Sequence, residues 1–247
     1  MILRDILDDI RSAMGLLTRL PLPAMATPRG AQAAWAWPVV GVVVGGLAAG
    51  VAWVMQAMGV PMGIVAGAVL VTLVMSTGAL HEDGLADTVD GFFGGWTREQ
   101  RLEIMKDSHI GSYGTLALIL SVGLRWQALA MVCHTPLAII AVAALSRAPM
   151  AVMMSSLPNA RGTGLAQSVG RPTQQMAGIA TSVGIIVAVL TAGWSHMMGM
   201  VIVMSLATLA MAHTARARIG GQTGDVLGAT QQVCEVVGLV VLATMAR

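Results

Sequence analysis

The sequence has few charged residues, few aromatic residues and little cysteine. Charged residues make up 11% of its 247 residues, whereas a typical soluble domain has about 25%. So few charges cannot cover a surface that faces water, which excludes an ordinary soluble protein. The chain is instead 56% hydrophobic with a mean hydropathy of +0.77. This composition predicts a polytopic membrane protein embedded in a lipid bilayer.

The two cysteines, Cys133 and Cys234, belong to no CxxC motif and no His/Cys cluster. We therefore predict two buried free thiols and exclude a disulfide framework or a zinc site. The chain has no internal repeat and no linker, so residues 1–247 are predicted to form a single membrane-embedded domain. We expect no nucleic-acid partner.

The fold is predicted to be an all-α helical bundle with about seven transmembrane helices and an amphipathic N-terminal helix. A membrane helix needs roughly 20 mostly apolar residues. The N-terminal segment, residues 1–20, carries three aspartates and no cleavage site, so we expect a helix on the membrane or beneath the bundle rather than a signal peptide. The predicted spans are residues 37–58, 61–80, 113–132, 136–157, 176–194, 197–212 and 226–246.

The basic residues outside the spans alternate from loop to loop. The N-terminal segment and the loops near 81–112, 158–175 and 213–225 carry arginine or lysine, whereas the short loops at 59–60, 133–135 and 195–196 carry neither. Loops rich in arginine and lysine stay in the cytoplasm. The long loops are therefore predicted to be cytoplasmic, and seven spans would place the C-terminus outside.

Seven of the twelve acidic residues lie between Glu82 and Asp107. Asp83, Asp87 and Asp90 are spaced so that on a helix they fall within an arc of about 60°. Three carboxylates on one face repel each other unless a cation lies among them, and hard oxygen ligands favour Mg²⁺, with Mn²⁺ as a substitute. A solvated acidic face is the alternative, but the intervening residues are mostly apolar or small. The pattern predicts a magnesium site that holds a diphosphate.

Other polar groups could complete this site. Asp107 could return as a fourth carboxylate, and the glycines near it, including Gly111 and Gly114, could let backbone approach a phosphate. The segment 220–225 (GGQTGD) is a second polar island, where Asp225 could be a ligand, a base or a helix N-cap. His81 and His109 are weaker candidates.

Three charged residues fall inside predicted spans: Arg125, Arg147 and Glu235. A charge in the hydrocarbon zone marks either a function or an internal ion pair, and the alternative for the arginines is that their side chains snorkel to the nearer interface. We expect Glu235 to pair with a buried arginine.

The run DGLADTVDG at residues 83–91 resembles the signature of the cobalamin synthase family, the adenosylcobinamide-GDP ribazoletransferases. Further patches resemble the family in the same order, and together they cover nearly the whole chain. They are LTRLPLP at 17–23, EIMKDSHIG at 103–111, SR at 146–147 and GGQTGDVLGA at 220–229. Lys106 and His109 stand where the family is expected to have arginine. Glu82 stands where an apolar residue is common, so it is not carried over as a ligand.

The resemblance implies a multi-pass enzyme of the bacterial inner membrane, with its site on the cytoplasmic side, that acts late in coenzyme B12 assembly. It would transfer adenosylcobinamide phosphate from adenosylcobinamide-GDP to α-ribazole, or to its 5′-phosphate, and release GMP. Other enzymes of nucleotide-loop assembly and a second copy of the chain are candidate partners. The expected catalytic residues are Asp83, Asp87, Asp107 and Asp225. The expected metal ligands are Asp83, Asp87 and Asp90. The expected substrate-binding residues are Arg19, Lys106, Ser108, Arg147, Gln222 and Thr223.

Three other classes of membrane protein are alternatives. A CDP-alcohol phosphotransferase would have arginine directly after Ala86, where this chain has Asp87. A membrane prenyltransferase would usually have a second Asp-rich motif, for which segment 220–225 is a poor match. A cation transporter would place acids within several spans, whereas here most of them lie in one window.

Overall fold

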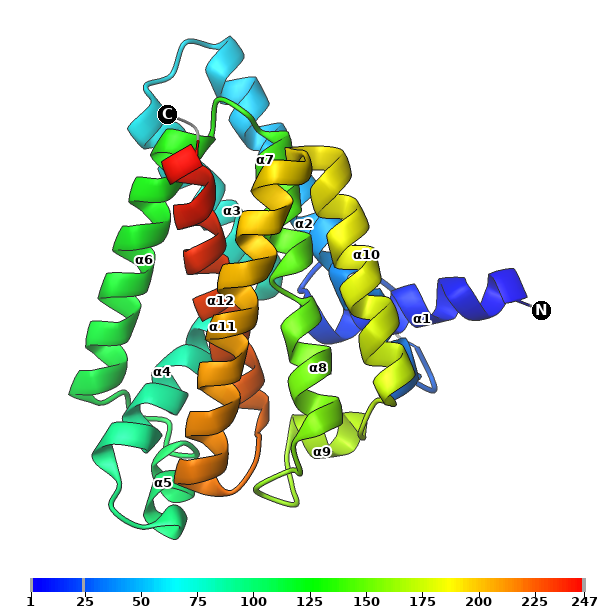
Figure 1. Cartoon of the computed structure of the whole chain (residues 1–247), viewed down its shortest axis with the longest axis vertical. Coiled ribbons are helices and arrows are strands. Elements are labelled where there is room, and N and C mark those ends of the chain that lie inside the picture. The colour runs from blue at the N-terminus through cyan, green and yellow to red at the C-terminus, as the bar shows by residue number, and fades with distance from the viewer. Residues whose placement is uncertain (1, 24, 246–247) are drawn as a thin grey trace.

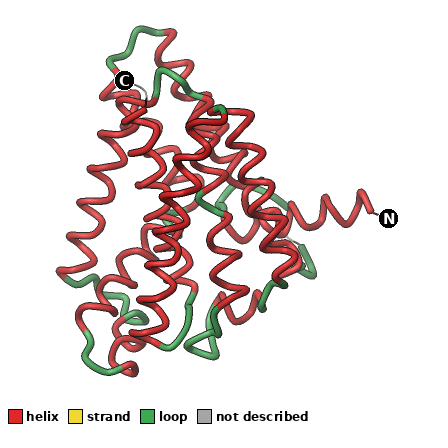
Figure 2. Tube along the Cα trace, in the orientation of Figure 1, coloured by secondary structure: helices red, strands yellow, loops and turns green. Residues whose placement is uncertain are grey.

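The computed structural model describes residues 2–23 and 25–245, which form helices joined mostly by short loops (Figure 1, Figure 2). Within these residues there is no β-strand, and Asn159 and Gln222 form an isolated β-bridge. The predicted all-α class is confirmed. The helices are α1 (Ile2–Leu17), the 3-10 helix η1 (Gly30–Ala36), α2 (Trp37–Ala57), α3 (Met62–Thr77), α4 (Leu80–Gly94), α5 (Arg98–Ile104), α6 (Ser112–Val132), α7 (Leu137–Leu145), α8 (Ala148–Ser156), α9 (Leu165–Val169), α10 (Gln174–Ala192), α11 (Trp194–Ile219) and α12 (Gly224–Met245).

Six helical stretches among the described residues are long and apolar enough to cross a membrane. Helices α3 and α4 also qualify together, but they are bent by 85° at the short break between them. The polytopic bundle is therefore confirmed, with a seventh span only if the bent pair counts as one. Residues 1 and 246, at the ends of two predicted segments, lie outside the described residues. The six stretches are Gly30–Ala57, Ser112–Val132, Leu137–Ser156, Gln174–Ala192, Trp194–Ile219 and Gly224–Met245.

Two of the predicted spans differ in detail from the observed helices. The span 136–157 is divided into α7 and α8 at Ser146 and Arg147, just before Pro149, whose ring nitrogen cannot donate a helical hydrogen bond. Helix α11 continues past the predicted end at residue 212 as far as Ile219. Hydropathy marks where an apolar stretch ends, whereas a helix can continue with polar residues beyond it.

Helix α1 projects sideways from the bundle, across the direction of the long helices (Figure 1). Arg29 ties it to the start of η1 through ion pairs with Asp5 and Asp9. Leu3 and Leu7 are more than half exposed. A helix in the N-terminal segment is thus confirmed, and its contact with the membrane stays a prediction.

Helix α4 packs closely against α12, and glycine makes this approach possible. A Cβ atom on Gly84 would lie 2.8 Å from the backbone oxygen of Asp225 and 3.3 Å from the Cα atom of Gly228. Small residues at a crossing let two helix backbones come close. This contact brings the Asp-rich helix beside the polar island that precedes α12.

Arginines on α5 hold the loops at this end of the bundle together. The guanidinium of Arg98 donates to the backbone oxygens of Ile219 and Ala160, both at 2.8 Å, and Arg101 donates to that of Arg218 at 3.0 Å. Arginine near a helix C-terminus satisfies carbonyl groups that have no partner inside the helix. The loop after α8 and the C-terminal end of α11 are thereby fixed next to α5.

Candidate active site

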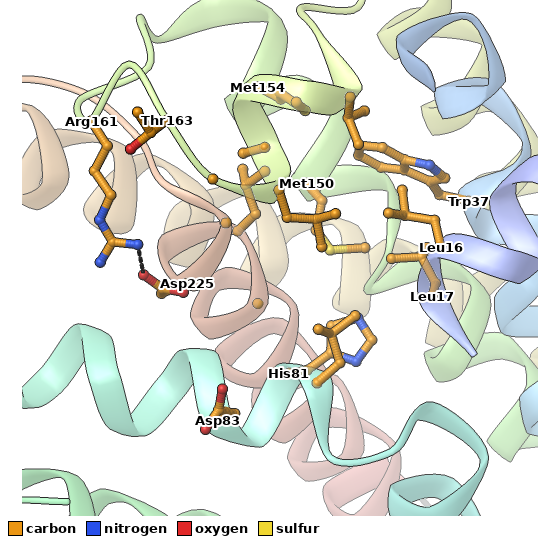
Figure 3. Close-up of a pocket in the computed structure, with 18 residues that line it drawn as sticks. Leu16, Leu17, Trp37, His81, Asp83, Met150, Met154, Arg161, Thr163 and Asp225 are labelled. Atoms are coloured by element: carbon orange, nitrogen blue, oxygen red, sulfur yellow. Dashed lines mark ion pairs between the residues drawn. The ribbon is translucent and has the colours of Figure 1, made fainter. Parts of the chain in front are cut away.

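A pocket opens between α1, α2, α4, α8, α9 and the start of α12 (Figure 3). It contains about 770 Å³ of empty space, part of which is open to solvent. One part is polar, with Asp83, Arg161, Thr163 and Asp225, and the other part is apolar. The polar part of its lining thus combines a residue of the Asp-rich helix with the polar island at α12.

Asp225 lies in the first turn of α12 and forms an ion pair with Arg161, with the Oδ2 atom 2.8 Å from Nη1. The helix N-cap is Thr223, whose hydroxyl oxygen accepts from the amide of Val226 at 3.3 Å. The same hydroxyl donates to Asp225 at 3.3 Å. Thr223 rather than Asp225 is therefore the N-cap of α12, and the Asp225 carboxylate faces the pocket.

Asp83 and Asp87 lie on α4 beside Asp225. The Asp83 side chain is exposed and lines the pocket, and Asp87 is half-buried. Asp83, Asp225 and Arg161 all lie close enough to the carboxylate of Asp87 to act on its charge. Three of the predicted catalytic carboxylates thus lie in one region of the structure, with one arginine among them.

Asp90 behaves differently from the prediction. Its two carboxylate oxygens accept hydrogen bonds from the amides of Gly111, at 2.7 Å, and Gly114, at 2.9 Å. A carboxylate at the start of a helix stabilises the free amide groups there, so Asp90 anchors the N-terminus of α6. Gly111 and Gly114 make room for this carboxylate, because a Cβ atom on either would collide with it. In this structure these two glycines make space for the Asp90 carboxylate rather than for a phosphate.

No ready-made metal centre is present in the part of the chain that the structure describes, because no three His, Cys, Asp or Glu side chains are gathered closely enough. The chemistry of the donors still suits Mg²⁺. Asp83, Asp87 and Asp225 offer hard carboxylate oxygens, and Arg161 supplies a single positive charge among three negative ones.

Asp107 lies apart from this group, contrary to its predicted place as a fourth carboxylate or a base. It is exposed, accepts from His109 at 2.7 Å, and lines a separate hollow with Trp96 and Glu103. This hydrogen bond lowers the pKa of Asp107 and raises the pKa of His109. Lys106 and Ser108 are exposed in the same connection.

The predicted substrate-binding residues are spread over several places. Arg19 is exposed and lines a neighbouring pocket that shares Leu16, Leu165 and Val169 with the first. Gln222 and Thr223 are buried, at 3% and 1% exposure, in the turn that precedes α12. Their contact with a substrate stays a prediction.

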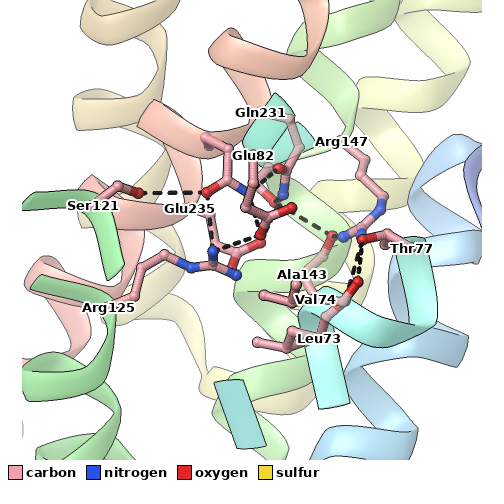
Figure 4. Close-up of polar contacts among 12 residues, drawn as sticks. Leu73, Val74, Thr77, Glu82, Ser121, Arg125, Ala143, Arg147, Gln231 and Glu235 are labelled. Atoms are coloured by element: carbon pink, nitrogen blue, oxygen red, sulfur yellow. Dashed lines mark hydrogen bonds and ion pairs between the residues drawn. The ribbon is translucent and has the colours of Figure 1, made fainter. Parts of the chain in front are cut away.

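A second group of charges is buried in the bundle (Figure 4). The Arg125 guanidinium lies 2.7 Å from a carboxylate oxygen of Glu82 and 2.6 Å from one of Glu235. Gln232 accepts from Arg125 and donates to Glu82, and Gln231 donates to Glu235. The predicted pairing of Glu235 with a buried arginine is confirmed, and Glu82 is a partner of the same arginine.

Arg147 belongs to this buried group and does not line the pocket, and its role as a phosphate partner stays a prediction. It is 2% exposed, and its Nη1 atom donates to the backbone oxygen of Ala143 at 2.6 Å. The charges of Glu235 and Glu82 act on it. Both cysteines are buried and free, as predicted.

Arg161 is the site residue that the sequence did not reveal. It stands in a loop between two apolar helices, where an arginine ordinarily signals only the side of the membrane. Its Nε and Nη2 atoms are buried and have no hydrogen-bond partner. Nothing in its spacing from Asp225 could have indicated the ion pair.

Comparisons with known proteins cover almost the whole chain. The family described as cobalamin-5-phosphate synthase matches residues 9–243. A protein of Bradyrhizobium diazoefficiens is 45% identical, over 98% of this chain and 95% of its own length. Proteins of Sinorhizobium and Azorhizobium caulinodans are 42% and 41% identical, over 97% and 98% of this chain and 97% of their own lengths. All three are named adenosylcobinamide-GDP ribazoletransferase. No solved structure matches.

Proposed function

Because the chain belongs to the cobalamin-5-phosphate synthase family, we propose that it transfers adenosylcobinamide phosphate from adenosylcobinamide-GDP to α-ribazole or its 5′-phosphate. GMP is the other product. The observation that carries this proposal is the pocket between α4 and α12, which combines Asp83, Asp225 and Arg161, with Asp87 near them, and an apolar part. A phosphate donor and an organic alcohol acceptor need these two environments side by side.

The reaction exchanges the phosphoanhydride bond of the donor for a phosphodiester bond to the acceptor. The acceptor hydroxyl attacks the phosphorus that carries the corrinoid arm, a new P–O bond forms, and the P–O bond to GMP breaks. The hydroxyl proton passes to a carboxylate, for which Asp87 and Asp225 are placed beside the polar part of the pocket. Asp107 is left out of this role because it lies with His109 in another hollow.

Asp83, Asp87 and Asp225 would hold Mg²⁺, or Mn²⁺ in its place. Asp225 replaces Asp90 in the ligand set, because both oxygens of Asp90 already accept amides of α6. When bound, the ion neutralises charge on the diphosphate and on the leaving phosphate. Arg161 contributes to the same task, because its unpartnered N–H groups can donate to phosphate oxygens while Nη1 stays on Asp225.

We propose that the enzyme lies in the bacterial inner membrane with the pocket on the cytoplasmic side. One observation supports this orientation. Arg98 and Arg101 lie on the short helix α5 and Arg161 lies in the loop after α8, and positive segments between spans stay in the cytoplasm. A cytoplasmic pocket would receive its nucleotide-linked donor from the compartment where nucleotides are made.

The test is GMP release from membranes that contain the protein, with both substrates and with or without Mg²⁺. Wild-type protein is expected to release GMP only when Mg²⁺ and α-ribazole, or its 5′-phosphate, are present. Asp83→Asn should abolish most of this release, whereas Glu99→Gln, on the exposed face of α5, should leave it unchanged. Release by folded Asp83→Asn protein at the wild-type rate would contradict the proposal.

A further inference from the structure

The apolar part of the pocket is separate from the groups that act on phosphate. Its walls are formed by side chains of α1, α2 and α8, and His81 lies below them (Figure 3). The apolar side chains are Leu16, Leu17, Trp37, Met150 and Met154. This lining suits a flat, largely apolar group and offers little to a charged one.

In the apolar part of the pocket, His81 is the polar group that indicates a bound ligand. The side chain is 2% exposed, and its Nε2 atom has no hydrogen-bond partner among the described residues. Buried polar atoms in proteins are nearly always paired, so an unpaired one on a residue that lines a pocket marks a place where a bound molecule can supply the partner. Trp37, on the opposite wall, also has a buried and unpaired Nε1 atom.

We propose that this apolar part binds the aromatic base of the nucleoside acceptor, with His81 Nε2 hydrogen-bonded to the free ring nitrogen of the base. The proposal rests on the proposed function, which supplies an acceptor of this chemical class. A neutral imidazole carries one donor and one acceptor nitrogen. The ring nitrogen of a benzimidazole-type base that is not bonded to ribose is an acceptor, so Nε2–H would donate to it.

The arrangement of the pocket also orients the acceptor. With the base between Trp37 and Met150, the ribose extends toward the polar part, where Asp83 and Asp225 lie (Figure 3). The sugar hydroxyl then reaches the reacting phosphate while the base stays away from it. Guanine fits less well, because its edge carries several donors and acceptors that these walls would leave unpaired.

The test compares the KM values of the two substrates in a His81→Phe variant. We expect the KM for α-ribazole to rise about tenfold, as for one lost hydrogen bond, and the KM for the corrinoid donor to stay within about twofold. His213→Phe, at an exposed position on α11, is the matched control and should change neither value. A rise in the donor KM with an unchanged acceptor KM would overturn the proposal. Absence of GMP release from wild-type protein would instead refute the proposed function.

A second measurement keeps His81 intact and therefore does not depend on how its variant folds. In a Leu80→Cys variant, the new thiol lines the same pocket, and the native cysteines are buried. We expect α-ribazole to slow its reaction with a maleimide, and GDP with Mg²⁺ to leave the rate unchanged. A Glu99→Cys thiol on α5 should react equally fast in both cases. Protection of position 80 by GDP and not by α-ribazole would overturn the proposal.

Discussion

Glu82 and Asp83 are neighbours in the sequence but belong to two different regions of the molecule. Glu82 is buried and pairs with Arg125, which in turn pairs with Glu235. Asp83 is exposed in the pocket, next to Asp87 and Asp225. In the first region two glutamates face two buried arginines, whereas in the second three aspartates share one. Charges that balance each other inside the bundle hold helices together, and charges in excess beside a pocket are available to a substrate.

Helix α12 shows the same division. Its first turn presents Asp225 to the pocket, and further along the helix Gln231, Gln232 and Glu235 point into the buried network (Figure 4). Helices α4 and α12 therefore each contribute to both regions. Variants in the two regions should separate loss of chemistry from loss of stability.

The largest effect is expected at Asp87. Asp87→Asn removes a carboxylate beside the pocket while it keeps the size of the side chain, so kcat should fall about 10³-fold, as for the loss of one major electrostatic contribution to catalysis. The thermal midpoint of the purified protein should stay near the wild-type value. Initial rates of GMP release and a melting curve in detergent would measure both. A large fall in the midpoint with normal turnover would place Asp87 in the structural region.

At Arg125 we expect the opposite result, which is a loss of stability without a change in the KM values. Arg125→Met leaves Glu82 and Glu235 buried without their cation, which should destabilise the protein by about 3–5 kcal/mol. Thermal unfolding in detergent would measure the loss, and the folded fraction should keep its KM values. Adding Glu82→Gln and Glu235→Gln to the same chain should restore much of the stability. If the triple variant is no more stable than Arg125→Met, the ion pairs are not what stabilises this region.

The sequence predicted the helical class, most of the spans and the importance of the Asp-rich segment, because hydropathy and helical spacing depend on local sequence. It also led to the buried pairing of Glu235, since a charge among apolar residues requires a partner. It could not distinguish Asp90 from Asp83, because both fit the same helical face. The difference arises from α6, whose first amides meet Asp90. The contact of Arg161 with Asp225 depends on two loops from distant parts of the chain, so no local pattern contains it.

A substitution at Gly84 tests the close approach of α4 and α12, the two helices that contribute to both regions. In Gly84→Ala the new methyl group would meet the backbone of α12 at 2.8 Å, so α4 has to shift and separate Asp83 from Asp225. We expect destabilisation of about 1–3 kcal/mol and lower GMP release. Gly123→Ala on α6 is the matched control, because its Cβ atom would meet nothing within 4 Å. Equal behaviour of the two variants would show that the close crossing does not matter.

The smallest effect is expected at Asp107, which is outside both regions. Its carboxylate raises the pKa of His109 by favouring the imidazolium form. In Asp107→Asn the pKa of His109 should fall toward its ordinary value, while GMP release changes by less than about twofold, in the range expected for an exposed pair. An NMR titration of the imidazole protons would measure the pKa. A collapse of activity in this variant would return Asp107 to the catalytic group.

The most direct test of the separation between the buried charge network and the pocket carboxylates is the binding of Mn²⁺ to the purified protein, measured by electron paramagnetic resonance. Asp83→Asn is predicted to weaken Mn²⁺ binding at least about tenfold, as for the loss of one carboxylate ligand, without a loss of stability. Glu82→Gln is predicted to lower the thermal midpoint and leave Mn²⁺ affinity unchanged. Equal affinity in wild-type and Asp83→Asn protein, or weaker binding in Glu82→Gln alone, would contradict the account.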